Sequence, residues 1–115
     1  MNIREAFDKI QLKKSTGKYR NKPKEVDGIK FQSQKEADYY TYLKNCEDVS
    51  FFLRQVPFDL PGKIRYFCDF AVFYGSGSGQ LYRTVFVDIK GYQTPVFKIK
   101  KKQVESLYNI TIELL

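Results

Sequence analysis

The second half of the chain alternates apolar and polar residues, or runs apolar throughout, over segments of strand length. These segments predict strands over residues 49–58, 64–74 and 81–90, with Pro-Gly at 61–62 and Gly-Ser-Gly-Ser-Gly at 75–79 as the turns. They therefore predict an antiparallel meander whose middle strand, apolar on both faces, is covered on both sides. The Gly/Ser link suits a natural hairpin tip and equally an artificial replacement for a longer loop.

Two segments with apolar residues at helical spacing lie before and after this meander in the sequence. Residues 33–44 begin with a capping box and place apolar residues on one face. Thr94 followed by Pro95 is an N-cap with a first-turn proline, and predicts a helix that continues to about residue 108. Residues 110–115 suit a last strand. The expected order is helix, three strands, helix and strand, which is an α/β fold with a mixed central sheet flanked by helices.

The chain before residue 25 differs from the rest. Apolar residues at helical spacing predict a short amphipathic helix over residues 2–13, which would pack on the domain or on a partner. Residues 13–24 are basic and interrupted by Gly and Pro, and Asp-Gly at 27–28 marks a tight hairpin. The basic segment is either a solvated linker or an arm that contacts phosphates through Lys18, Arg20, Lys22 and Lys24. We therefore expect an N-terminal helix and arm over residues 1–24 and a main domain over residues 25–115.

Composition narrows the classes of function. A length of 115 residues, 43% of them hydrophobic, suits one domain with one core. The absence of histidine excludes Ser-His-Asp hydrolases, His-metal nucleases and zinc-finger chemistry. Cys46 and Cys68 lack metal-ligand spacing, so a reduced, cytoplasmic protein is expected, and no apolar run suits a membrane span. The net charge of +7 favours a polyanionic partner, nucleic acid before membrane.

Acidic residues within the apolar strands are the candidate chemistry. Asp69 is the one acid in residues 64–74, and Asp88 and Lys90 lie two residues apart in the next strand, where they would share a face. Antiparallel pairing would bring Asp88 toward Asp69. A buried charge needs a donor, a cation or a metal, so a structural ion pair is the alternative to a functional site. Glu36 either caps its own helix or joins the same centre.

Carboxylates in this arrangement suit a hard divalent cation such as Mg²⁺ or Mn²⁺, which takes oxygen ligands. Asp69, Asp88 and the Ile89 carbonyl would form half of its shell. Glu36 would bind a second metal or hold a metal-bound water. The metal would lower the pKa of a bound water and neutralise charge during phosphodiester hydrolysis. Lys90 would orient that water, help to deprotonate it, or stabilise the developing negative charge.

The order of these residues resembles the PD-(D/E)xK nuclease superfamily, with an acid on the first helix, an Asp on the second strand and (D/E)-x-K on the third. Here these are Glu36, Asp69 and Asp88-Ile89-Lys90. Four segments more narrowly resemble small phage-encoded endonucleases of the DUF1064 type: residues 28–36, 55–58, 66–70 and 87–100, within a resemblance over roughly residues 18–115. The resemblance implies a restriction-endonuclease-like core. It also implies an Mg²⁺- or Mn²⁺-dependent DNA endonuclease, similar to junction-resolving enzymes that act on branched recombination or replication intermediates, encoded by a phage or prophage of a bacterial host.

The resemblance further implies a site lysine, Lys98, in the helix after the motif, placed to contact the scissile phosphate. This sequence departs from the family pattern in having Cys68 rather than proline before Asp69, and Asp88 rather than the commoner Glu. Asp is one methylene shorter, so the backbone must make up the metal distance. Neither departure removes a candidate ligand.

Basic residues predict a phosphate track. Besides the arm, the candidate DNA contacts are Lys98, Lys101 and Lys102, although a solvated outer helix face explains them nearly as well. The two-fold symmetry of a four-way junction favours a homodimer. Two alternatives remain open: a DNA-binding module that keeps the nuclease fold without turnover, and a regulatory protein that uses the N-terminal helix and arm on a protein partner.

Overall fold

The computed structural model of the chain describes residues 24–115. The chain divides into two compact units, Met1–Cys46 and Glu47–Leu115, and each is described by itself. The predicted helix over residues 2–13, and Lys18, Arg20 and Lys22 of the predicted arm, lie outside the described residues. The boundary predicted at residues 24 and 25 therefore stays a prediction.

The first unit contains a small hairpin and a helix. Strands β1 (Lys24–Val26) and β2 (Ile29–Phe31) pair antiparallel and are followed by α2 (Gln34–Lys44). Asp27 and Gly28 turn the chain with φ angles of 53° and 77°, as a tight two-residue hairpin requires, which confirms the prediction from Asp-Gly. The predicted cap is also present, since Ser33 Oγ accepts a hydrogen bond of 3.1 Å from the Glu36 N–H.

Aromatic packing and one carboxylate attach α2 to this hairpin. The rings of Phe31 and Tyr40, both buried, lie with centroids 5.1 Å apart. The Tyr40 hydroxyl donates to Asp27 Oδ2 at 3.0 Å, and Lys44 Nζ lies 2.5 Å from the same oxygen. Asp27, in the turn of the hairpin, therefore anchors the C-terminal half of α2.

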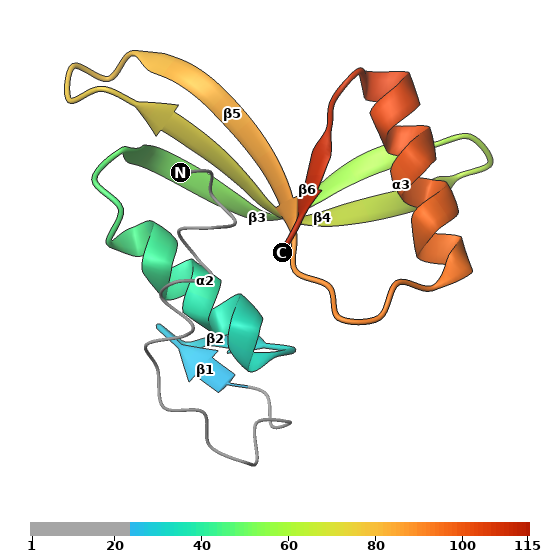
Figure 1. Cartoon of the computed structure of the whole chain (residues 1–115), viewed down its shortest axis with the longest axis horizontal. Helices are drawn as coiled ribbons and strands as arrows, with labels where there is room; N and C mark the ends of the chain where they lie inside the picture. Colours follow the sequence, from blue (N-terminus) through green and yellow to red (C-terminus); the bar gives the residue numbers. More distant parts are fainter. Residues whose placement is uncertain (1–23) are drawn as a thin grey trace. The chain divides into compact units, whose positions relative to one another are not determined.

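The second unit contains a four-stranded mixed sheet and a helix (Figure 1). Its strands lie in the order β3-β4-β5-β6, and their bounds are Val49–Leu60, Ile64–Gly75, Leu81–Asp88 and Ile112–Leu114. The first three form the predicted antiparallel meander, and β6 runs parallel to β5 after the crossover helix α3 (Pro95–Tyr108). The described residues therefore confirm a mixed α/β fold. Several strand bounds were predicted wrongly: β3 ends at Leu60 rather than residue 58, β5 ends at Asp88 rather than residue 90, and β6 covers residues 112–114 rather than 110–115.

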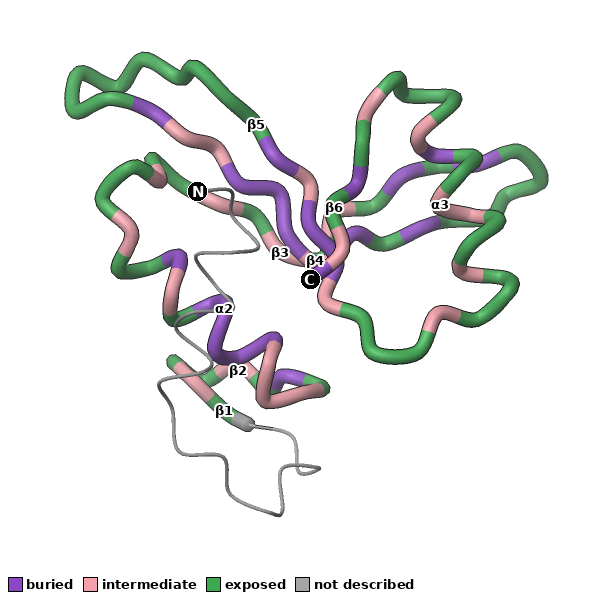
Figure 2. Tube along the Cα trace, in the orientation of Figure 1, coloured by how far each residue is buried: buried purple, intermediate pink, exposed green. Residues whose placement is uncertain are grey.

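One core cluster of the second unit is formed by residues of β3, β4, α3 and β6, and Figure 2 shows where buried residues lie along the chain. The cluster contains Phe58, Leu60, Tyr66, Cys68, Val104 and Ile112. The prediction that β4 is covered on both faces holds for the consecutive buried residues 70–72. It is wrong for the first half of the strand, where Arg65 is exposed and Phe67 is 51% exposed because only the face toward α3 is packed.

Local sequence signals set the ends of α3. Thr94 Oγ1 accepts a hydrogen bond of 3.1 Å from the Phe97 N–H, and Pro95 occupies the first turn, as predicted. At the other end Asn109 takes the left-handed conformation with φ 55°, which ends the helix. Residues next to the two ends of α3 therefore determine where this crossover helix begins and ends.

Removing the cap should destabilise the protein without affecting the sheet directly. We expect Thr94→Ala to lower the free energy of unfolding by about 1 kcal/mol, because the Phe97 N–H loses its acceptor. Urea denaturation followed by circular dichroism measures this change. Thr94→Ser keeps the acceptor and should behave like the wild type; equal losses in both variants would contradict the capping role.

Candidate functional site

The candidate site lies where the pairing of the long strands is interrupted. In the β3–β4 ladder, Arg54 pairs with Phe70 and Val56 with Cys68, while Gln55 and Asp69 between them do not pair. The β4–β5 ladder ends with the pair Phe70 and Val87, so Asp69 and Asp88 would be the next pair in register. The two carboxylates therefore lie at the point where β4 and β5 separate.

Hydrogen bonds between the two strands continue there through side chains. The Asp69 N–H donates to Asp88 Oδ1 at 2.8 Å, and the Ile89 N–H donates to Asp69 Oδ2 at 2.9 Å. Side-chain carboxylates thus accept the N–H groups at the place where the backbone ladder ends. The juxtaposition of Asp69 and Asp88 predicted from antiparallel pairing is confirmed. Their roles as metal ligands stay predictions.

The remaining carboxylate oxygens also accept hydrogen bonds. Gln55 Nε2 donates to Asp69 Oδ1 at 3.1 Å, and the Tyr66 hydroxyl donates to Asp88 Oδ2. All four donors are electrically neutral, so they orient the carboxylates without cancelling their charge. A carboxylate oxygen has two lone pairs, so each oxygen keeps one for a further partner.

Asp88 is completely buried, and burial raises its pKa to about 6. The hydrogen bond from the Asp69 N–H and the positive charges of Lys90 and Lys101 act in the opposite direction and lower it. A buried carboxylate with a raised pKa, beside a second carboxylate, is a set of hard oxygen donors that a divalent cation would stabilise. The pair therefore fits Mg²⁺ or Mn²⁺ as part of a coordination shell.

Lys90 lies beyond the strand that was expected to contain it. The prediction that Asp88 and Lys90 share one face of a strand is wrong, because β5 ends at Asp88. Asp88 is buried, whereas Lys90 is exposed. The Lys90 ammonium lies 4.9 Å from the centroid of the Phe97 ring of α3, within cation–π range. Backbone hydrogen bonds from Leu115 N–H to the Asp88 carbonyl and from Lys90 N–H to the Leu115 carbonyl hold this segment.

Glu36 is buried in the first turn of α2, with its N–H capped by Ser33. It belongs to the first unit, whereas Asp69 and Asp88 belong to the second. Its convergence with them stays a prediction. Among residues 24–115 no group of three or more His, Cys, Asp or Glu side chains is arranged to hold a metal ion. Within the second unit, the structure brings Asp69 and Asp88 together.

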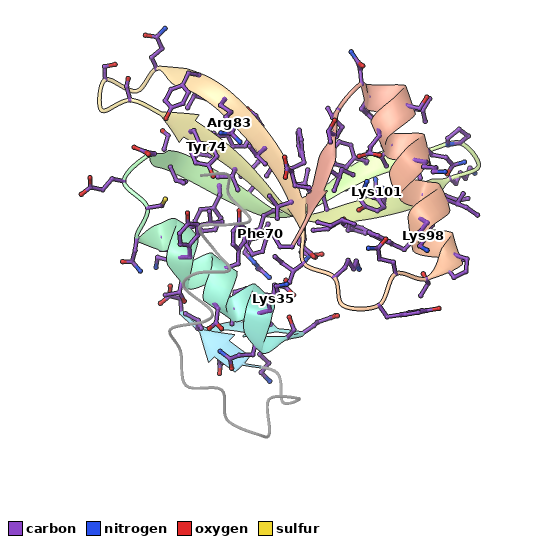
Figure 3. The ribbon with its side chains drawn as sticks, viewed as in Figure 1. Lys35, Phe70, Tyr74, Arg83, Lys98 and Lys101 are labelled. Atoms are coloured by element: carbon purple, nitrogen blue, oxygen red, sulfur yellow. The ribbon has the colours of Figure 1, made fainter. Side chains whose placement is uncertain are left out.

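The predicted basic residues differ in their surroundings. Lys98 and Lys102 are exposed, and Lys101 is half-buried with its Nζ 3.0 Å from Glu105 Oε2. Figure 3 shows Lys98 and Lys101 on α3. Lys101 also contributes positive charge at Asp88. Lys24 begins β1 in the first unit. The α3 lysines therefore divide into two solvent-facing candidates for phosphate contact and one that takes part in the electrostatics of the site.

Comparison with known proteins identifies the family. The model of a family described as "Protein of unknown function (DUF1064)" matches residues 16–113. The chain belongs to the DUF1064 family. No curated protein and no solved structure matches it. Across residues 24–115, the helices of this DUF1064 chain are all too short or too polar to cross a membrane.

Two residues of this DUF1064 site were not recognised from sequence as part of it. Gln55 and Tyr66 contact the carboxylates, and in the sequence each is an ordinary member of a strand candidate. The positive φ of Gln55, 51°, has no sequence signal, because glutamine has no preference for that conformation.

Cys68, which stands where the family pattern has a proline before Asp69, is buried. Burial raises the pKa of its thiol to about 12, so it acts as a packing residue.

The pKa of Asp88 predicts how stability depends on pH in metal-free protein. The folded pKa, about 6, lies above the usual value of 3.8, so the folded state holds its proton more tightly than the unfolded state. Stability from this group is greatest below pH 4 and falls as pH rises to about 6. Relative to Asp88→Asn, the wild type should lose about 2 kcal/mol of unfolding free energy between pH 4.5 and 7.5.

Urea denaturation in EDTA at both pH values measures this difference. Asp88→Asn keeps the shape of the side chain and can still accept from the Asp69 N–H, so it isolates the charge. If the unfolding free energies of the two proteins change in parallel between pH 4.5 and 7.5, the pKa of Asp88 is not raised.

Proposed function

We propose that this DUF1064 protein is a metal-dependent DNA endonuclease on a restriction-endonuclease-like core, acting on branched or flapped DNA in the cytoplasm of a phage-infected or prophage-carrying bacterium. The meeting of Asp69 and Asp88 at the end of the β4–β5 ladder carries the proposal. A buried carboxylate beside another is costly unless a cation or a reaction uses it. The order of acids and lysine along the chain, which resembles the PD-(D/E)xK pattern, supports the same conclusion.

Each residue has a role in this proposal. Asp69, Asp88 and the Ile89 carbonyl would hold Mg²⁺ or Mn²⁺, and Glu36 would complete the site if the first unit brings it there. When bound, the metal would lower the pKa of a water molecule and neutralise charge on the phosphate. Lys90, whose ammonium the Phe97 ring holds near α3, would orient the attacking water or the phosphate oxygen.

The basic surface supports DNA as the substrate. Lys98 and Lys102 are exposed on α3, the helix that directly follows the Asp88–Lys90 segment, and the net charge is +7. Phosphate contacts of this kind give affinity without sequence preference. A structure-selective enzyme needs no base readout, and two-fold junctions would suit a dimer of this chain.

A second candidate is a DNA-binding module without turnover. The observation that favours it is that every oxygen of Asp69 and Asp88 already accepts a hydrogen bond from the protein. In that case the carboxylates would only close the end of the sheet, and α3 would bind DNA. Cleavage assays separate the two functions.

Removing one carboxylate charge should abolish cleavage. We expect Asp88→Asn and Asp69→Asn each to lower the cleavage rate by about 100-fold or more, because the metal and the developing charge lose their stabilisation. The measurement is cleavage of a four-way junction, a flap and a linear duplex in Mg²⁺, Mn²⁺ or EDTA. Branched substrates should be cut faster than duplex, and EDTA should stop the reaction.

A matched control is Asp59→Asn, which removes the same charge from an exposed residue of β3 that pairs with Arg65 on the surface. It should cut at the wild-type rate. Wild-type protein that binds DNA but cuts none of the three substrates would favour the module without turnover. Wild-type protein that binds no nucleic acid would contradict both functions.

Exposed lysines of α3 should contribute to binding in a salt-dependent way. We expect Lys98→Gln and Lys102→Gln each to reduce the slope of log affinity against log salt by about 0.9, the value for one lost phosphate contact on B-DNA. Fluorescence anisotropy with a labelled junction in EDTA measures it without cleavage. Lys44→Gln is the control, since Asp27 already neutralises Lys44; an equal effect there would mean that the α3 lysines act only through net charge.

A further inference from the structure

Gln55 has a backbone conformation that its position does not explain. Its φ is 51° in the middle of β3, within a strand that continues for five residues beyond it. Among the described residues, the other non-glycine positions with positive φ are Asp27, Lys63 and Asn109. Asp27 and Lys63 lie in hairpin turns, and Asn109 caps α3, where this conformation is ordinary. A glutamine held left-handed inside a strand is unfavourable unless its surroundings impose it.

The surroundings of Gln55 are the candidate site. Gln55 lies opposite Asp69 and interrupts the β3–β4 ladder there, since the pairs on either side, Arg54 with Phe70 and Val56 with Cys68, are regular. Its side-chain amide donates to Asp69 Oδ1 at 3.1 Å. The irregular backbone and the side-chain contact therefore coincide on the carboxylate that lies beside Asp88.

The hydrogen bond from Gln55 sets the orientation of the Asp69 carboxylate, which the other contacts of Asp69 do not set. Asp69 is less buried than Asp88, and its Oδ2 accepts from the Ile89 N–H. One hydrogen bond to one oxygen still allows the carboxylate plane to rotate, whereas a second donor on the other oxygen sets it. Because an amide is neutral, it orients Asp69 and leaves the negative charge available to a cation.

We propose that Gln55 is a positioning residue, which uses its left-handed backbone and its amide to orient Asp69 for a divalent cation. The proposal rests on the proposed function, because it assumes that Asp69 binds metal. Partners of this kind, behind a metal ligand, commonly change metal affinity by 10- to 100-fold. Gln55 would thus belong to the site although it contacts neither metal nor substrate.

Glycine at this position separates positioning from folding. Gln55→Gly removes the amide and also relieves the left-handed backbone, so the urea midpoint should stay the same or rise while Mn²⁺ binding weakens by about tenfold. Isothermal titration of the full chain with MnCl₂ alone measures the affinity. Lys63→Gly is the matched control: it relieves a φ of 59° in the β3–β4 turn and should leave Mn²⁺ affinity unchanged.

A second variant guards against loss of folding. Gln55→Met keeps the length of the side chain and removes only the donor, so it should also weaken Mn²⁺ binding by about tenfold. Wild-type affinity in a folded Gln55→Gly or Gln55→Met variant overturns the proposal. Absence of Mn²⁺ binding by the wild type overturns it as well. A third outcome separates the two proposals. If the wild type binds Mn²⁺ but cuts no DNA, and both variants bind Mn²⁺ more weakly, the positioning role is supported and the nuclease function is contradicted.

Discussion

The second unit is organised around two hydrogen bonds that join the Asp69 segment to the Asp88–Ile89 segment. Asp88 Oδ1 accepts from the Asp69 N–H at 2.8 Å, and Asp69 Oδ2 accepts from the N–H of Ile89, the residue after β5, at 2.9 Å. The Asp69 and Ile89 N–H groups therefore have acceptors at the place where the ladder ends. The same two contacts hold the two acids side by side, so the site is part of the sheet rather than an addition to it.

These hydrogen bonds explain why β5 ends before the apolar pattern of the sequence does. Apolar alternation continues through Ile89, but the Ile89 N–H bonds to the Asp69 side chain, and the segment from Asp88 to Lys90 pairs with Leu115 instead. The end of the strand is thus determined by a residue 20 positions earlier in the chain. Lys90 is consequently placed outside the strand, where the ring of Phe97 contacts its ammonium.

Features with local causes were predictable from the sequence, and features with distant causes were not. Ser33 and Thr94 cap their helices through residues three positions away, so α2 and α3 were located closely. The meeting of Asp69 and Asp88 followed from antiparallel pairing of adjacent strands. The contacts of Gln55 and Tyr66 could not be predicted, because strand periodicity gives a face but neither a backbone irregularity nor a hydroxyl partner.

The kind of donor around these acids bears on whether they are structural or functional. Elsewhere in the described chain, Asp27 and Asp59 form direct ion pairs with Lys44 and Arg65, which neutralise them at the surface. Inside the protein, a purely structural acid without a charged partner would be strongly destabilising. Asp88 instead contacts a backbone amide and a hydroxyl, while the charge of Lys90 acts from a distance. Neutral donors orient a carboxylate without neutralising its negative charge. Binding of a divalent cation is most favourable at such a carboxylate, because no cation of the protein competes for the charge.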